Sequence, residues 1–442
     1  MTSPQIAKQH RFRSAGRLLG SRFDAFRERN FRIYFLGRAT STVGDMVVPV
    51  ALAFALLDLT GSAKDLGIVM ACRSAPLIVF LLPGGVWADR FSRRRIMIAT
   101  DTTCFAAQGV TALLLVLGRA TVWELGALQV VYGTANALFR PAVSGIVPQV
   151  VSPDRRQQAN ALLALMRSAS LAVGPALAGV LVVAVGPSWT LFVDAGSFAA
   201  SALLLTNVRL LHGRPEEADE PSESFFAELK GGWKEFWSRT WLWVLVASAA
   251  VWQIGYMATF LVVGPVIAEH FLGGPGAWAT ILTSGGIGAI AGGFLALYYT
   301  PSRPLLVGTL MGLLVVPQMA LLALHAPTAV IAAAAFVDGI QYTFFNALWN
   351  TVLQEQIPPR ALSRVSSYDW LGSVAFLPIG YAVVGFAAVA IGATTTVWIA
   401  TAVLAASTAA VLAVPSVRAL GRASQEEEVE APPQVAADEA AA

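Results

Sequence analysis

The stretch GGVWADRFSRRR, residues 84–95, decides the class of this protein. It joins two long apolar segments, LGIVMACRSAPLIVFLLPGGVWA (66–88) and IMIATDTTCFAAQGVTALLLVLG (96–118). A connection with one Asp and four Arg is too short to form a domain, so we interpret it as a tight turn at a membrane face. The four arginines indicate that this face is cytoplasmic, because cytoplasmic loops carry an excess of Lys and Arg.

The composition supports a membrane protein. Of the 442 residues, 56% are hydrophobic and 13% are charged, whereas soluble domains carry about 25% charged residues. Crossing the hydrocarbon core takes about 20 apolar residues in a helix, and the apolar runs are long and unbroken. We predict an all-α polytopic membrane protein with twelve transmembrane helices, at about 31–57, 65–88, 96–117, 121–147, 157–185, 187–208, 240–268, 275–299, 303–324, 327–354, 362–390 and 393–414.

The basic residues predict the orientation. They gather before the first segment and in the even-numbered loops, whereas the odd-numbered loops hold only Lys64 and Arg119. Both termini are therefore expected in the cytoplasm, with the chain in the inner membrane of a bacterial-type cell. The basic residues form no single stripe, so nucleic acid is not an expected partner.

The sequence predicts five parts: a basic tail (1–30), a six-helix half (31–209), a linker (210–239), a second six-helix half (240–414) and a disordered tail (415–442). In the linker, FFAELKGGWKEFW (225–237) places aromatic residues at helical spacing, which favours an amphipathic helix on the membrane surface. The alternative is that this segment starts the seventh membrane helix.

The two six-helix halves resemble each other. A shift of roughly 206 residues places Gly133, Gly174 and Gly179 on Gly339, Gly380 and Gly385. Such pseudo-symmetric halves are typical of secondary transporters, whose substrate site lies between them.

Two motifs resemble signatures of the major facilitator superfamily. Gly85, Asp89, Arg90, Arg93 and Arg94 match its loop 2–3 motif, although Ser92 stands where Gly is usual. Gly174, Pro175 and Gly179 are similar to its antiporter motif, with Ala178 replacing one Gly, and that motif is associated with export.

From about residue 30 to 415 the chain resembles an efflux subgroup that contains enterobactin-type siderophore exporters and macrolide efflux pumps. VGDMVVPVALAF (43–54) and VGPALAG (173–179) are among the segments that carry this resemblance. It implies transport by alternating access between the two halves.

The resemblance also implies a gate at the loop 2–3 motif. Asp89 and Arg93 would pair if the turn were helical, because they stand four residues apart. Asp101 and Asp369, near the cytoplasmic ends of the third and eleventh helices, are expected to join this charge network. The network would lock the cytoplasmic side in the outward-open state.

Charged residues inside the membrane need a reason, since each costs about 2.5–3.5 kcal/mol near the bilayer centre on insertion scales. Asp45 stands about 21 Å from the start of the first helix, and Arg73 about 12 Å from the start of the antiparallel second helix. These depths nearly coincide, so we predict that the two residues form an ion pair. It is either a proton-coupling pair or a static pair that orients two helices.

Asp338 is a third candidate for proton coupling, near the middle of the tenth helix. Gln341, Phe345 and Trp349 follow it on one helical face, and Trp252, Tyr256 and Phe260 form a similar stripe on the seventh helix. Each stripe faces either a substrate or the protein core. The candidate substrate contacts are Asn136, Arg167, Trp252, Gln253, Tyr256, Phe260, Gln341, Phe345 and Trp349.

Enzyme and cofactor signatures are not found in the sequence. There is no Walker A motif, the four histidines lack metal-ligand spacing, and Cys72 and Cys104 fall inside separate predicted helices. No metal and no cofactor are expected.

We therefore predict a monomeric exporter of an amphipathic small molecule, driven by proton antiport. A drug, an antibiotic or a siderophore-like compound would suit it. A lysophospholipid flippase, an importer and a non-transporting membrane receptor are the alternatives.

Overall fold

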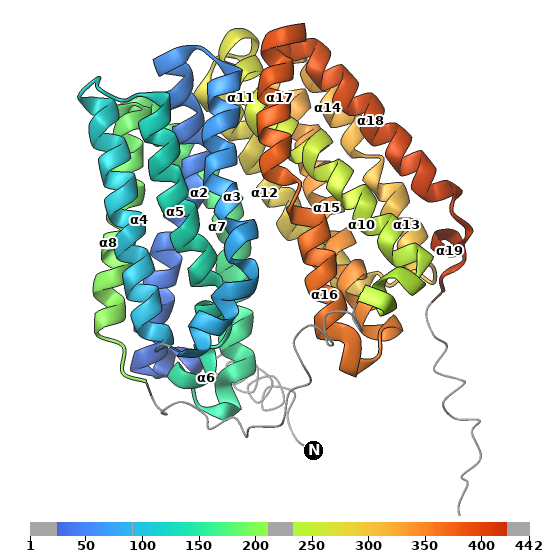
Figure 1. Ribbon diagram of the computed structural model, residues 1–442, viewed down its shortest axis with the longest axis horizontal. Helices are drawn as coiled ribbons and strands as arrows, with labels where there is room; N and C mark the ends of the chain where they lie inside the picture. Colours follow the sequence, from blue (N-terminus) through green and yellow to red (C-terminus); the bar gives the residue numbers. More distant parts are fainter. Residues whose placement is uncertain (1–23, 91, 211–232, 422–442) are drawn as a thin grey trace, which may run out of the picture.

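The computed structural model describes residues 24–90, 92–210 and 233–421, with the side chains of 81–90, 141, 144, 359, 360, 363 and 364 left out (Figure 1). All regular elements in these ranges are helices. Ten of the described helical stretches are long and apolar enough to cross a membrane. The predicted all-α polytopic class is thereby confirmed, whereas the count of twelve spanning helices stays a prediction.

The N half contains six long helices. They are α2 (Arg29–Thr60), α3 (Ala63–Arg90), α4 (Arg93–Val116), α5 (Val122–Ser144), α7 (Arg156–Val185) and α8 (Pro187–Thr206). Three short helices join or precede them: η1 (Asp24–Arg27), α6 (Val147–Val150) and η2 (Pro153–Arg155). Local signals explain the tight turns. Gly61 ends α2 with a φ of 63°, and a capping box of Thr121 and Glu124 starts α5.

The C half is less regular than the sequence predicted. Its elements are α10 (Thr240–Trp252), η3 (Gln253–Ala258), α11 (Thr259–Ile267), η4 (Ala268–Leu272), α12 (Pro275–Tyr298), α13 (Pro304–Gly312), α14 (Val315–Ala323), α15 (Thr328–Gln356), α16 (Pro359–Val374), α17 (Leu377–Ile391), α18 (Ala393–Ala413) and α19 (Pro415–Ala419). Three segments predicted as single helices are interrupted. Two π-helices, η3 and η4, interrupt the first, and breaks at 313–314 and 375–376 divide the other two.

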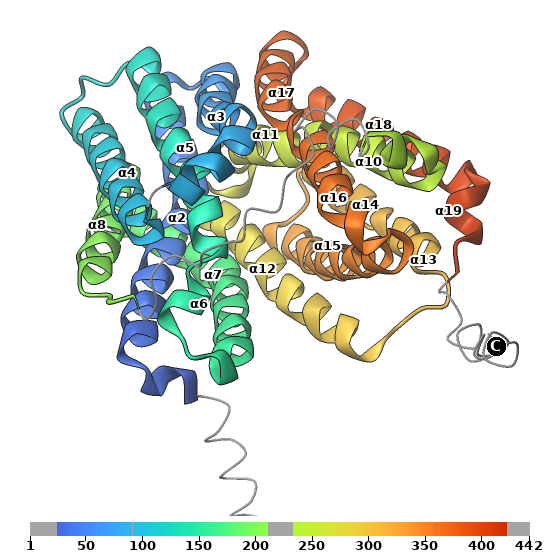
Figure 2. The same cartoon turned by 60° about the horizontal axis from the view of Figure 1, so that its bottom comes forward.

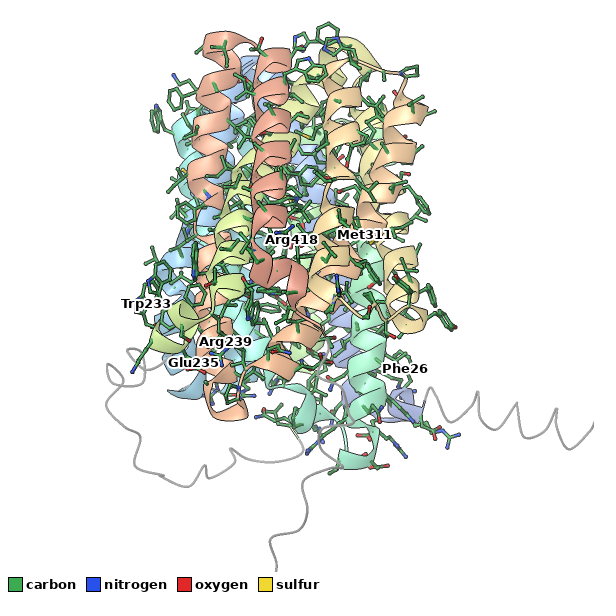
Figure 3. The ribbon with its side chains drawn as sticks, turned by 90° about the vertical axis from the view of Figure 1, so that its right-hand side faces the viewer. Phe26, Trp233, Glu235, Arg239, Met311 and Arg418 are labelled. Atoms are coloured by element: carbon green, nitrogen blue, oxygen red, sulfur yellow. The ribbon has the colours of Figure 1, made fainter. Side chains whose placement is uncertain are left out.

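A short helical stretch precedes the C half. Residues 233–238 are helical, and Arg239 separates them from α10. Arg239 pairs with Glu235 at 2.7 Å, and Trp233 packs edge-on against Tyr368 of α16 (Figure 3). The described part of the predicted amphipathic helix is thus distinct from α10. The rest of it, residues 225–232, lies outside the described residues.

The two halves lie side by side as separate bundles (Figure 1). We call the side on which α2 begins and α3 ends the near side, and the opposite side, with Gly61 and Gly186, the far side. Contact between the halves is made chiefly by α3 with α17 and by α7 with α12. Figure 2 shows α12 running between α7 and its own neighbour α15.

The α3–α17 contact brings backbones together on the far side. A Cβ atom added to Gly67 would lie 2.4 Å from the carbonyl oxygen of Tyr381 and 3.1 Å from the Cα of Gly385. Gly67 lies near the start of α3, and Gly385 lies in the last turns of α17. Side chains are excluded from this contact, so the far side is tightly closed.

The α7–α12 contact is equally close. A Cβ on Gly286 would lie 2.3 Å from the carbonyl oxygen of Leu171, and one on Gly179 would lie 2.5 Å from the Cβ of Ala279. Gly179 of the predicted antiporter motif is therefore a contact point between the two halves.

Candidate substrate and ion-coupling site

Asp45 of α2 and Arg73 of α3 form an ion pair. Arg73 Nη2 lies 2.8 Å from Asp45 Oδ1, and the side chains are 19% and 29% exposed, respectively. The predicted meeting of these two residues is confirmed. The two side chains lie in the middle parts of α2 and α3 and are partly exposed.

The backbone around Asp45 is shaped by Pro49 and Gly174. Pro49 has no N–H, so the carbonyl of Asp45 loses its i+4 helical donor. A Cβ on Gly174 would lie 2.2 Å from the Cβ of Met46, so α7 approaches α2 directly beside Asp45. Gly174 of the predicted antiporter motif is thus a close contact point between α7 and α2, and α7 continues through Pro175 to Val185.

Tyr132 of α5 completes this group. Its hydroxyl donates a hydrogen bond of 2.5 Å to Asp45 Oδ1, and the guanidinium of Arg73 lies over its ring, 3.8 Å from the centroid. The same carboxylate oxygen therefore accepts from both Tyr132 and Arg73. Tyr132 was not among the predicted site residues, because an isolated Tyr in an apolar helix carries no periodic signal.

A chain of hydrogen bonds leads away from this pair through the N half. Arg73 Nη1 donates to Gln129 Oε1 at 2.8 Å, and Gln129 Nε2 donates to Gln108 Oε1 at 2.9 Å. Gln108 Nε2 then donates to Asp194 Oδ2 at 2.8 Å. These contacts connect α3, α5, α4 and α8, and the sequence analysis found no signal for the two glutamines.

The C half contains a second Tyr–Asp pair. Tyr256 of η3 donates to Asp338 Oδ2 of α15 at 2.7 Å and approaches Gln318 Oε1 of α14 at 3.3 Å. Among the described residues, Asp338 Oδ1 is buried without a hydrogen-bond partner. The π-helix η3 sets the position of Tyr256, and such bulges are frequent at functional sites.

Aromatic side chains surround this second pair. Trp252 stacks on Tyr342 with centroids 5.4 Å apart, and Tyr256 stacks on Phe260 at 5.3 Å. Tyr342 is 43% exposed and was not among the predicted contacts. The predicted stripe of Trp252, Tyr256 and Phe260 is thus part of an aromatic stack whose exposed edge is Tyr342.

Two arginines of the N half approach the C half. Arg140 of α5 lies over the ring of Trp370 of α16, 5.4 Å from its centroid. Arg167 of α7 is exposed and interacts electrostatically with both Arg140 and Tyr342. Neither arginine forms an ion pair with a carboxylate among the described residues. Sequence analysis singled out Arg167 and missed Arg140, which stands near the end of its helix.

The remaining candidates are distributed over both halves. Asn136 is half-buried on α5, one turn before Arg140. Gln253 and Gln341 each have a buried Oε1 without a partner in the described part of the chain. Phe345 stacks on Trp349, and Trp349 is buried against Trp241 in the hydrophobic core of the C half. The predicted stripe on α15 therefore enters the core at its Trp349 end.

The loop 2–3 arginines contact the N half. Arg94 Nε donates to the carbonyl of Leu205 at 2.9 Å, and its Nη2 donates to that of Thr206. The guanidinium of Arg93 lies directly over Gly145. Both contacts tie the start of α4 to its neighbours.

The remaining loop 2–3 residues are arranged differently from the predicted helical turn. Gly85, Asp89 and Arg90 belong to the last turns of α3, and the side chains of Asp89 and Arg90 lie outside the described residues. Because α3 ends at Arg90 and α4 begins at Arg93, Asp89 and Arg93 do not share one helix. The condition for their predicted i, i+4 pairing is not met.

Asp101 and Asp369 bind separate partners. Asp101 accepts a hydrogen bond of 2.6 Å from Ser201 of α8, whereas Asp369 accepts one of 3.0 Å from Trp349 Nε1 of α15. In this structure each carboxylate connects helices of its own half.

The described residues contain no cluster of His, Cys, Asp or Glu that could hold a metal ion. The arrangement is one of long apolar helices, an ion pair in the N half and an aromatic stack in the C half. The family model of the Major Facilitator Superfamily matches residues 34–375. This chain belongs to the Major Facilitator Superfamily. It is a multi-pass membrane transporter of that superfamily.

Two curated superfamily relatives are exporters. The chain is 23% identical over 357 residues to macrolide efflux protein A of Streptococcus pyogenes, covering 79% of this chain and 87% of that protein. It is 25% identical over 370 residues to the enterobactin exporter EntS of Salmonella typhi, covering 80% and 84%. The resemblance to an efflux subgroup is confirmed.

Solved structures show the same fold at low identity. A bacterial homologue of the human lysosomal transporter Spinster, in an inward-facing and unoccupied conformation, aligns with a TM-score of 0.69 and 15% identity over 89% of this chain and 97% of that one. The nucleoside transporter NupG aligns with a TM-score of 0.65 and 14% identity, over 87% and 98%.

Proposed function

We propose that this superfamily member exports an amphipathic small molecule in exchange for protons. The observation that carries the proposal is the accessible ion pair of Asp45 and Arg73, held between two spanning helices. A scaffold protein would gain nothing from charges in the membrane interior, since each is costly there. The two efflux relatives support the direction of transport.

The structure is interpreted as the inward-facing state. The far side is closed by backbone contacts at Gly67 and Gly385, and the positive-inside pattern favours the near side as cytoplasmic. A similar fold is described as inward-facing in the Spinster homologue. In this state the substrate would enter from the cytoplasm.

Coupling would depend on competition for Arg73. When Asp45 is ionised, the carboxylate holds Arg73 at 2.8 Å. When Asp45 takes up a proton, that charge attraction is lost and Arg73 can bind substrate or another partner. By linkage, a substrate that draws Arg73 away makes protonation of Asp45 more favourable to the same extent.

The substrate class follows from the side chains between the halves. Arg140 and Arg167 present two guanidinium groups that form no ion pair with a described carboxylate. Arg140 lies over Trp370, and Arg167 interacts electrostatically with Tyr342, which stacks on Trp252. Guanidinium groups recognise carboxylates and phosphates, and they also stack on aromatic rings. We infer that the substrate carries an anionic group next to an aromatic or apolar surface.

The proposal is tested in proteoliposomes that contain the purified full chain and an interior pH dye. The probes are a catecholate siderophore, a macrolide, a lipophilic cation and a lysolipid. We expect a ligand-dependent pH change that Asp45→Asn abolishes. Asp58→Asn is the matched control, because Asp58 is exposed at the end of the same helix.

Substrate flux without any pH change would overturn proton antiport. Flux of the lysolipid alone would favour the flippase alternative. Binding of a probe without flux of any probe would favour a receptor.

A further inference from the structure

Asp194 of α8 is a buried carboxyl group that the proposed transport cycle does not use. It is fully buried, and its Oδ1 has no hydrogen-bond partner among the described residues. Asp194 lies against α2 next to Asp45, because a Cβ on Gly44 would be 2.8 Å from Asp194 Oδ1. An ionised carboxylate with one oxygen unpartnered in the low-dielectric interior is costly.

The amide chain to Asp194 has a fixed polarity. Arg73 can only donate, so Gln129 must turn its Oε1 toward Arg73 and its Nε2 toward Gln108. Gln108 must then donate to Asp194. Each amide is fully buried and held at both ends, so the chain connects the charge of Arg73 electrostatically to Asp194.

The charges of Asp45, Arg73 and Asp194 together favour the binding of one proton. One cation, Arg73, pairs with Asp45 and interacts electrostatically with Asp194, and the two carboxyl groups interact with each other. The exposed Arg140 of α5 also interacts electrostatically with Asp45, but it forms no ion pair with it. With both ionised, the group of Asp45, Arg73 and Asp194 would carry a net negative charge, which the low dielectric around the fully buried Asp194 disfavours. With one protonated, the group is neutral.

We propose that Asp194 is a second proton-binding group, which shares one proton with Asp45. When Asp45 is ionised and holds Arg73, Asp194 carries the proton. When Asp45 is protonated, Asp194 is ionised. It then accepts the hydrogen bond from Gln108, at the end of the hydrogen-bond chain that runs from Arg73 through Gln129 and Gln108. The partly exposed Asp45 exchanges its proton with water directly. The fully buried Asp194 exchanges its proton only when the helices around it separate during the cycle, and the amides transmit charge rather than the proton.

The other groups that face Asp194 fit this assignment. α2 contributes Asp45, α3 contributes Arg73, and α5 contributes Tyr132, whose hydroxyl is already donated to Asp45. α4 contributes Cys104 together with the neutral Gln108. On α7, all of whose residues are described, no titratable side chain interacts with Asp194. Arg73 is thus the cation that balances Asp194.

The role of this proton in transport rests on the coupling proposed for Asp45, but the test does not. Infrared difference spectra of the purified full chain in lipid nanodiscs report the carbonyl stretch of protonated carboxyl groups. We expect Asp194→Asn to remove one such band at neutral pH and Asp58→Asn to remove none. Should Asp194→Asn fail to fold, isotope-labelled aspartate shows in the wild-type chain whether any such band arises from an aspartic acid.

The coupling is tested by Asp45→Asn. Without Asp45, Asp194 becomes the counter-ion of Arg73 and loses its proton more readily. As the pH is raised, the band should therefore disappear at a proton concentration about tenfold higher, or more, than in the wild-type chain. Adding Gln108→Leu should reverse part of this shift, because Asp194 then loses the hydrogen bond from Gln108, whereas the removal of the Asp45 charge still favours ionised Asp194.

A band that survives Asp194→Asn, or aspartate label that produces no such band, would overturn protonation of Asp194. A band that titrates identically with and without Asp45 would overturn the sharing of the proton. Failure of proton antiport itself would instead appear as flux without a pH change in proteoliposomes, whatever the spectra show.

Discussion

Tyr132 and Asp338 stand 206 residues apart in the sequence, the same spacing that separates Gly133 from Gly339. Each forms a hydrogen bond with the first membrane-spanning segment of its own half. Tyr132 donates to Asp45 of α2, whereas Asp338 accepts from Tyr256 of η3. The two halves thus contain the same Tyr–Asp pair with the partners exchanged between helices. Only the pair in the N half has a described cation, Arg73, beside its carboxylate.

The presence of Arg73 beside Asp45 predicts that neutralising Asp45 destabilises the protein. Asp45→Asn leaves a partly buried Arg73 without its counter-ion and should cost about 1.5–3 kcal/mol of stability, the contribution of a hydrogen bond to a charged group. Arg73→Gln in the same background should recover part of that loss. Thermal unfolding of the single and double variants in detergent measures both. If the loss of stability in the double variant equalled the sum of the losses in the two single variants, Asp45 and Arg73 would not interact directly.

Tyr256→Phe should destabilise the C half. It removes the hydrogen bond to Asp338, whose other oxygen is already unpartnered among the described residues. An unsatisfied buried polar group costs about 1–3 kcal/mol. Tyr298→Phe is the control, since Tyr298 is 86% exposed. Unchanged thermal stability of Tyr256→Phe would show that Asp338 finds another donor.

Gly67→Ala should open the far side. The added methyl would lie 2.4 Å from the carbonyl of Tyr381, and the overpacking costs about 1–3 kcal/mol in the closed arrangement. The population should shift toward the outward-open state by about tenfold or more. Spin-label distances across α3 and α17 measure this shift. Gly109→Ala is the control, because a Cβ there meets nothing within 4 Å.

Arg140→Gln and Arg167→Gln should each weaken binding of an anionic aromatic ligand about tenfold, or about 1.4 kcal/mol. A lipophilic cation should bind no worse. Arg140→Lys keeps the charge but loses the planar stacking on Trp370, so its effect should be intermediate. Arg119→Gln, at an exposed turn, serves as the control in equilibrium binding. Equal losses for anionic and cationic ligands would contradict a charge-selective site.

Gly145→Ala should slow transport without weakening ligand binding. A Cβ at Gly145 would overlap the guanidinium of Arg93, 1.0 Å from its Nη1. Displacing Arg93 should perturb the start of α4 and lower the transport rate about tenfold, which is about 1.4 kcal/mol in the barrier. Transport rate and affinity are measured separately in proteoliposomes. A loss of affinity alone would place this residue in the substrate site instead.

Much of the architecture was predictable from the chain, because a bilayer demands long apolar helices and confines charges to short loops. The Asp45–Arg73 pair was predictable for the same reason, since helical rise fixes the depth of each charge. The π-helix at Gln253–Ala258 and the breaks at 313–314 and 375–376 were not, because tertiary packing decides such irregularities.

The sequence by itself determined the membrane class, the two related halves and the depth of the intramembrane charges. Only the tertiary structure decided which side chains meet across helices. It brought Gln129, Gln108 and Asp194 into one chain with Arg73, and it placed Arg140 on Trp370 of the other half. The reason is physical: hydropathy and helical rise fix a residue's depth, whereas the azimuth of each helix and its choice of neighbour arise from packing of the whole bundle.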